Sequence, residues 1–207
     1  MPSGSARAQT VKSRAPQRRR GRERVASLQA AAAALFVEKG YDATTMTEIA
    51  ARAGASIGSL YLFFPTKHSL AEAMLMELAE TLSGRLEALK ERVDGRKAAE
   101  VGDALFDELA DFTHRYPAYG VLIDLSGEYS WRLGLRARRR AQIAALFQEA
   151  EPPLPKEQAE HLAVIVPQLL RMGLLVSGRP DAEGVMAELR AMLRHHLEWP
   201  ETTKKES

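Results

Sequence analysis

The chain has 207 residues, of which 45% are hydrophobic and 27% charged, and it contains no cysteine. This length and balance are typical of one large or two modest globular domains, and they exclude a chain that is disordered throughout. The absence of cysteine excludes a disulfide framework, a thiolate zinc site and a cysteine nucleophile.

The net charge of +2 is unevenly distributed along the chain. Residues 1–70 carry eleven Lys or Arg and four Asp or Glu, whereas the remaining residues carry eighteen and twenty-three. A basic N-terminal segment joined to a mildly acidic remainder favours binding to an anionic polymer, because charge attraction speeds the encounter and binding releases counterions. An acidic membrane surface would also fit this charge distribution. No segment approaches the roughly 20 apolar residues that span a bilayer, so we expect a soluble, cytoplasmic protein.

The first elements follow from local signals in chain order. Residues 1–20 are rich in Ser, Gly, Pro, Ala and Arg without a hydrophobic period, which predicts a flexible basic arm. A helical period then runs from Arg22 to a left-handed cap at Gly40. Thr45 and Glu48 form an S/T-x-x-E capping box, which predicts a short second helix that ends at Gly54.

A third helix is predicted from Ile57 to about Phe63, after a tight glycine turn and with Ser56 as its N-cap. Pro65 then interrupts the chain, because proline is poor inside a helix and tolerated at its first turn. Two short helices joined by a glycine turn, after a longer bracing helix, form the helix-turn-helix pattern. We therefore predict a DNA-binding domain over residues 21–68.

Beyond Thr66 the apolar spacing predicts only helices. We expect them at 67–93, 101–116, 118–132, 134–149, 157–177 and 182–199, with a loop at 152–155. The predicted fold class is therefore all-α, with an N-terminal three-helix helix-turn-helix domain. A C-terminal helical domain follows at 69–200, and a polar tail closes the chain at 201–207.

The last two helices carry more apolar surface than a single stripe. Val164, Met172 and Leu175 extend the hydrophobic surface of helix 157–177 round its cylinder, so this helix needs cover on two sides. We predict a two-fold four-helix contact between two copies, the alternative being a core within one chain. The residues assigned to this dimer interface are Leu162, Ile165, Val166, Leu169, Leu170, Gly173, Leu174, Met186, Leu189 and Leu193.

Residues 44–70, TTMTEIAARAGASIGSLYLFFPTKHSL, resemble the DNA-binding signature of the TetR (tetracycline-repressor-like) family of bacterial transcription regulators. The matching positions are Thr45, Ile49, Ala50, Gly54, Ser56, Gly58, Leu60, Tyr61, Phe64, Lys67 and Leu70. The resemblance covers about residues 22–70. It implies a ligand-responsive regulator, a repressor, that binds a pseudo-palindromic double-stranded DNA operator as a homodimer.

The resemblance also divides the apolar run 60–64 between core and surface. Leu60 and Phe64 are four residues apart, so periodicity places both on the inner face of the third helix. Phosphate contacts are implied for Thr47, Tyr61 and Lys67. The resemblance also implies that Thr45 and Ser56 hold the starts of their helices near the DNA backbone. Base reading falls to the outer face, which carries Ile57, Gly58, Ser59, Leu62 and Phe63.

Positions 57, 62 and 63 depart from the family, in which they are often polar or imidazole-bearing. Because the outer face has no Arg, Asn or Gln, it offers no bidentate contact to guanine or adenine. We therefore expect specificity from thymine methyl groups, the Ser59 hydroxyl, water and DNA shape. The arginine arm is expected to contact DNA as well, the alternative being a solubilising tail.

The larger domain is implied by the resemblance to bind a small-molecule effector. Aromatic side chains with interspersed polar groups gather between residues 106 and 131, a composition that suits a ligand site. The residues assigned to it are Phe106, Phe112, Tyr116, Tyr119, Asp124, Glu128, Tyr129 and Trp131. Taken singly, each is also explained by an ordinary core or a solvated face.

Enzymes are the principal rival class. The five histidines include no H-x-x-x-H pair, and the chain has no glycine-rich phosphate loop and no nucleophile elbow. We therefore expect no catalytic residues, no metal site and no cofactor. The alternatives to a ligand-responsive regulator are a helical nucleic-acid-binding protein without effector sensing and, less favoured, a small helical enzyme.

Overall fold

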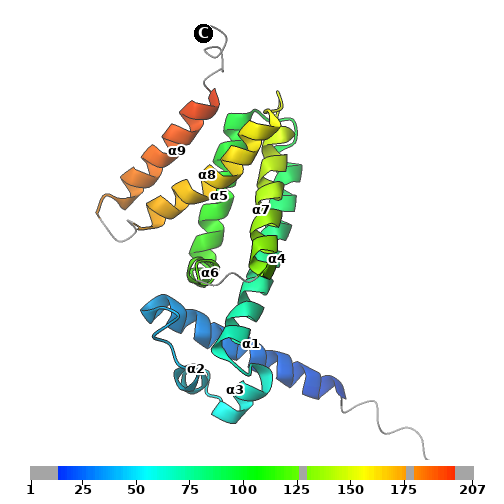
Figure 1. The fold of residues 1–207 in the computed structure, drawn as a ribbon, viewed down its shortest axis with the longest axis vertical. Helices are drawn as coiled ribbons and strands as arrows, with labels where there is room; N and C mark the ends of the chain where they lie inside the picture. The colour runs from blue at the N-terminus through cyan, green and yellow to red at the C-terminus, as the bar shows by residue number, and fades with distance from the viewer. Residues whose placement is uncertain (1–13, 126–129, 176–179, 199–207) are drawn as a thin grey trace, which may run out of the picture. The chain divides into compact units, whose positions relative to one another are not determined.

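The computed structural model of the chain describes residues 14–125, 130–175 and 180–198. Within these ranges all regular structure is helical, which confirms the predicted fold class (Figure 1). The helices are α1 (Arg14–Lys39), α2 (Met46–Arg52), α3 (Ile57–Phe63), α4 (Lys67–Val93), α5 (Ala98–Arg115), α6 (Ala118–Ile123), α7 (Ser130–Gln148), α8 (Lys156–Leu175) and α9 (Ala182–Glu198).

The described helices divide into two compact units. The first contains α1, α2, α3, the start of α4 and α6, and the second contains the rest of α4 with α5, α7, α8 and α9. The division between the units falls inside α4 after Met76, so the buried Leu70, Met74 and Leu75 belong to the first unit. Helix α6, expected in the second domain, also belongs to the first and contacts α1.

The core of the first unit forms on one face of α1. Leu28, Ala32 and Phe36 lie at successive spacings of four residues and are fully buried. Ile49 of α2 and Leu60 of α3 are fully buried in the same unit. Leu28, Ala32 and Phe36 follow the helical period expected between Arg22 and Gly40.

Helix α1 begins at Arg14, so the flexible arm predicted for residues 1–20 is wrong for residues 14–20. Pro16 lies in the first turn, where a missing backbone N–H loses no hydrogen bond, and the Gln and Arg residues after it are good helix formers. Residues 1–13 lie outside the described residues. The arginines from Arg18 to Arg24 are therefore carried on a helix.

In the second unit α5 contacts α7, α8 and α9, and α8 contacts α7 and α9 (Figure 1). Helix α9 approaches its neighbours closely at two glycines. A Cβ atom at Gly102 of α5 would lie 2.5 Å from Leu197 Cδ1, and one at Gly173 of α8 would overlap Met186. The missing side chains therefore allow this close packing.

Ion pairs join other helices to α5. Arg85 of α4 contacts Glu108 at 2.5 Å and Asp111 at 2.6 Å, and Arg194 of α9 contacts Asp103 at 2.5 Å. The guanidinium of Arg85 holds the pKa of Asp111 below its ordinary value by hydrogen bonding. Because most of these side chains are partly exposed, solvent screening limits what each pair contributes to stability.

One predicted helix boundary is wrong. We expected helices at 118–132 and 134–149, whereas α6 ends at Ile123 and α7 begins at Ser130. Asp124 is the C-cap of α6, and Gly134 lies inside α7 where a Cβ atom would meet nothing within 4 Å. Glycine at 134 is therefore tolerated in the helix and does not end one.

Candidate nucleic-acid interface

The start of α2 is held by the predicted capping box. Thr45 is extended, and its Oγ1 accepts a hydrogen bond from the Glu48 amide at 3.3 Å. The Glu48 carboxylate in turn accepts from the Thr45 amide at 2.9 Å, and it is paired with Lys39 of α1. The hydrogen bond from Lys39, followed by those from Thr45, lowers the pKa of Glu48 to about 2.

The start of α3 is also capped as predicted, because Ser56 Oγ accepts a hydrogen bond from the Ser59 amide at 3.2 Å. The helix has one buried and one exposed face. Leu60 is fully buried and Phe64 nearly so, whereas Leu62 exposes 79% of its surface, and Ile57 and Phe63 are also exposed. The predicted outer face of α3 is therefore an apolar surface open to a partner.

The remaining predicted contact residues lie around this face. Tyr61 and Thr47 are exposed, and Ser59 is half-buried. Gly58 is exposed in α3, where a Cβ atom would meet nothing within 4 Å, so packing within the chain does not require glycine there. On α1, Arg19, Arg20 and Arg22 are exposed, with Arg19 3.5 Å from Glu23.

Lys67 differs from the role implied by the resemblance. Its Nζ donates to the carbonyl oxygens of Tyr41, Asp42 and Thr44 at 2.8, 3.1 and 2.9 Å. It also lies 4.4 Å from the centroid of the Tyr41 ring. Because an ammonium has three N–H donors, these carbonyls engage all of them, and the geometry does not support the expected phosphate contact.

Several contacts that fasten α2 to α1 are not visible in the sequence. Arg24 donates to the Gly54 carbonyl and Ser27 Oγ to the Ala53 carbonyl, each at 3.3 Å, while Arg52 pairs with Glu38 at 2.5 Å. The partners lie 14 to 30 residues apart along the chain. No local pattern marks them, because each depends on the packing of two helices.

The predicted effector residues do not form one described site. Phe106 and Phe112 are buried in the second unit, and the Phe112 and Tyr116 rings lie 5.0 Å apart. Tyr119 is buried in the first unit, and Asp124 is exposed there. Glu128 and Tyr129 lie outside the described residues, as does the side chain of Trp131.

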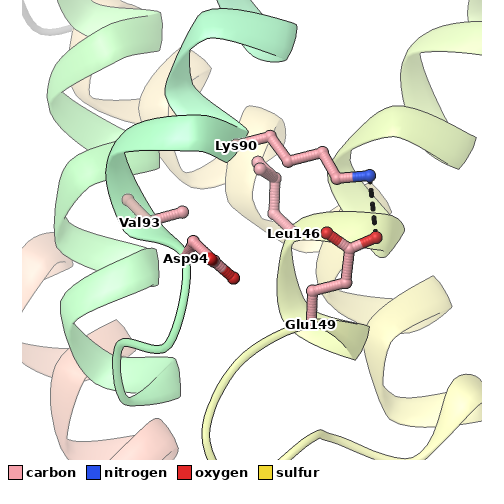
Figure 2. A pocket seen from close by; sticks show the side chains of 5 residues that line it. All are labelled: Lys90, Val93, Asp94, Leu146 and Glu149. Carbon is pink, nitrogen blue, oxygen red and sulfur yellow. Dashed lines mark ion pairs between the residues drawn. The ribbon is translucent and has the colours of Figure 1, made fainter.

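A shallow surface hollow that encloses no cavity lies elsewhere in the second unit, between the ends of α4 and α7 (Figure 2). It is lined by Lys90, Val93, Asp94, Leu146 and Glu149. Lys90 and Glu149 pair across it at 2.8 Å, and Asp94 adds a second carboxylate to the lining. None of the predicted effector residues lines this hollow.

Most of the predicted dimer stripe is core within one chain. Leu162, Val166, Leu170, Gly173, Leu189 and Leu193 are buried in the second unit, which fits the alternative of a core within one chain. They are covered because α8 packs against α5, α7 and α9. Leu169 and Met186 are half-buried, and the side chain of Leu174 lies outside the described part.

The exposed apolar side chains of this region lie on another face. They are Val164, Ile165, Met172 and Leu175 of α8 and Met192 of α9. Of the predicted stripe, only Ile165 belongs to this set. The residues that extend the hydrophobic surface round α8 are therefore the ones left uncovered.

Two further findings limit the kinds of site present in the described ranges. No three His, Asp or Glu side chains there could hold a metal ion together. None of the described helices combines the length and apolar character that crossing a bilayer requires.

Comparison with known proteins agrees with this geometry. Residues 28–74 match the family model described as "Bacterial regulatory proteins, tetR family". The chain is 30% identical over 178 residues to the A-factor receptor protein of Streptomyces griseus, a match over 83% of this chain. It spans 61% of that receptor, which is less than two thirds of the relative's own length.

Two other matches extend the comparison beyond the helix-turn-helix. One is the solved structure of a bacterial regulatory protein in the tetR family from Rhodococcus RHA1, with a TM-score of 0.67 and 20% sequence identity. The match covers 84% of this chain and 97% of that protein, so the fold is shared. HTH-type transcriptional repressor Rv3405c of Mycobacterium tuberculosis is 33% identical over 136 residues, which are 61% of this chain and 72% of that protein. Because this identity covers far more than the DNA-binding helices, the chain belongs to the TetR family of bacterial transcriptional regulators.

Proposed function

We propose that the chain is a repressor that binds a pseudo-palindromic operator as a homodimer and releases it in response to a small molecule. The observation that carries the proposal is the division of α3 into a buried face with Leu60 and an exposed apolar face with Leu62. A short capped helix that presents large apolar side chains fits the edge of a major groove about 12 Å wide.

The outer face of α3 is proposed to read bases by apolar contact. Ile57, Leu62 and Phe63 carry no hydrogen-bonding group, so thymine methyl groups are the base features that they can recognise. Tyr61 and Thr47 are exposed beside them and offer hydroxyls to phosphates. The exposed arginines of α1 add the sequence-independent attraction to the DNA backbone.

Dimerisation is proposed through the uncovered apolar side chains of α8 and α9. Ile165, Met172 and Leu175 follow one another along α8 at close to helical spacing, and Met192 adds an exposed side chain from α9. An isologous contact of these helices with their copies forms a four-helix bundle. A two-fold dimer then presents its two α3 helices to half-sites about 34 to 36 Å apart.

Effector binding is proposed in the second unit near the aromatic residues of α5. Phe106 and Phe112 are buried there, with Tyr116 beside Phe112. An apolar ligand that binds the DNA-bound and the free conformations with different affinity changes operator binding by typically about 1 to 3 kcal/mol. Such a ligand shifts repression without contact to DNA.

The proposal is tested by fluorescence anisotropy with the purified protein and the intergenic DNA that flanks its gene. We expect preference for this DNA over a scrambled duplex of equal composition, with affinity falling steeply as salt rises. Leu62→Asp abolishes the preference, because it places a carboxylate in the groove. Leu133→Asp on α7, where the side chain is 61% exposed, is the matched control and retains it. Equal affinity of the wild-type protein for both duplexes would overturn the proposal.

A further inference from the structure

The side chain of Lys67 occupies a built site within the first unit. Its Nζ is surrounded by the carbonyl oxygens of Tyr41, Asp42 and Thr44 at 2.8 to 3.1 Å. The face of the Tyr41 ring lies 4.4 Å away, and that ring itself packs 5.3 Å from the buried Phe36. The three carbonyls supply hydrogen bonds to the ammonium, and the ring face adds a cation–π contact.

The carbonyls belong to the connection between α1 and α2. Thr44 is buried, and its Oγ1 donates to the Gly40 carbonyl at 2.7 Å and to the Leu35 carbonyl at 3.3 Å. Thr45, the next residue, is the N-cap of α2. The Lys67 ammonium is therefore hydrogen-bonded to the residue that precedes the N-cap of α2, and α2 leads to α3 through a turn of four residues.

We propose that Lys67 is a positioning residue that sets the placement of the α2–α3 pair for DNA binding, and that it makes no phosphate contact. This inference rests on the proposed function. Lys67 is the first residue of α4, so its three hydrogen bonds tie the start of α4 to the α1–α2 connection. Reaching a phosphate would require the ammonium to give up its three hydrogen bonds to carbonyl oxygens.

Two substitutions separate a positioning role from a phosphate contact. Lys67→Met removes both the charge and the donors. Lys67→Arg keeps the charge but replaces three converging donors with a planar fork that does not match the three carbonyls. A positioning role predicts that both variants lose operator affinity, whereas a phosphate contact predicts that only Lys67→Met does.

The salt dependence of binding supplies a second readout. Each phosphate contact contributes about 0.9 to the slope of log Kobs against log salt concentration, so a dimer that loses two contacts has a slope shallower by about 1.8. For a positioning role we expect an affinity loss of about tenfold in both variants with the wild-type slope. A shallower slope in Lys67→Met together with wild-type affinity in Lys67→Arg would overturn the proposal.

Hydrogen exchange of the DNA-free protein tests the same inference without DNA. We expect the amides of residues 41–48 to exchange at least tenfold faster in Lys67→Met, while the amides of α5 keep the wild-type rate and so report an intact fold. Unchanged exchange at 41–48 would contradict the positioning role. If the wild-type protein shows no preference for any DNA, the proposed function fails, and the exchange result still decides the role of Lys67 in the fold.

Discussion

Leu60 and Leu62 lie two residues apart on α3, yet Leu60 is fully buried and Leu62 exposes 79% of its surface. Truncation of the two side chains therefore has opposite consequences. Leu60→Ala leaves a cavity in the core of the first unit and destabilises the protein by about 2 to 5 kcal/mol. Leu62→Ala changes the free energy of unfolding by no more than about 0.5 kcal/mol, because its side chain packs against little in the free protein.

Leu62→Ala should instead weaken operator binding. A leucine that buries its side chain against a base edge contributes about 1.5 to 3 kcal/mol, so we expect an affinity about 10 to 150 times lower by anisotropy. Replacing thymine by uracil at the position that Leu62 contacts removes the methyl group and should weaken wild-type binding. The Leu62→Ala protein should be insensitive to that replacement, and equal sensitivity of both proteins would contradict apolar readout.

Gly58→Ala separates folding from DNA binding at one position. Alanine has space at 58 and is a better helix former than glycine, so we expect a free energy of unfolding raised by about 0.5 to 1 kcal/mol. If the backbone of α3 approaches the DNA closely at this point, operator affinity should fall although stability rises.

Chemical denaturation and anisotropy on the same preparation measure both effects of Gly58→Ala. Gly134→Ala is the matched control, because it also lies in a helix with open space at its Cβ position. It should be stabilised in the same way and bind the operator with wild-type affinity. Wild-type affinity of Gly58→Ala would show that the groove does not come close to position 58.

The Glu48 carboxylate should make stability depend on pH. Its folded-state pKa is lowered to about 2 from an ordinary value of 4.5, because Lys39 and Thr45 donate to the ionised form. A lowered folded-state pKa means that this stabilisation is fully present above pH 4.5 and is lost as the pH falls from 4.5 towards 2.

Thermal unfolding of the wild-type protein and of Glu48→Gln from pH 7 to pH 2 checks this expectation. The difference in Tm between the two proteins should be constant above pH 5 and shrink below 4.5, because glutamine does not titrate. A difference that stays constant down to pH 2 would mean that Glu48 is not stabilised by ionisation. Glu183, in the first turn of α9, supplies a control substitution to Gln at another helix start.

Met172 should mark the contact between protomers. Its side chain is 56% exposed on the uncovered face of α8, so in a dimer through this face Met172→Glu places a charge in an apolar interface. We expect a monomer by light scattering with unchanged helix content, and weaker operator binding. Leu133→Glu introduces the same charge at an exposed leucine of α7 and should remain dimeric, and a dimeric Met172→Glu would contradict the proposed interface.

Structural features that depend on residues close together in the sequence were predictable. The capping box of Thr45 and Glu48, the Ser56 cap and the buried positions Leu60 and Phe64 follow from contacts three or four residues apart, and the structure confirms them. The helix-turn-helix could therefore be recognised before the fold was known. The start of α1 at Arg14 was not predicted, because composition distinguishes a charged helix poorly from a charged coil.

By itself, then, the sequence determined the order and approximate extent of most helices and which face of α3 is apolar, because both depend on backbone propensity and on a repeat of 3.6 residues. Tertiary structure alone decided which apolar face of α8 is covered and that the Lys67 ammonium is hydrogen-bonded within the chain. Val166 is buried and Ile165 is exposed, although both are aliphatic, and Lys67 binds carbonyls from 23 to 26 residues away. These outcomes depend on how separate helices pack together, because the burial and the hydrogen bonds of a side chain are determined by the residues around it in space.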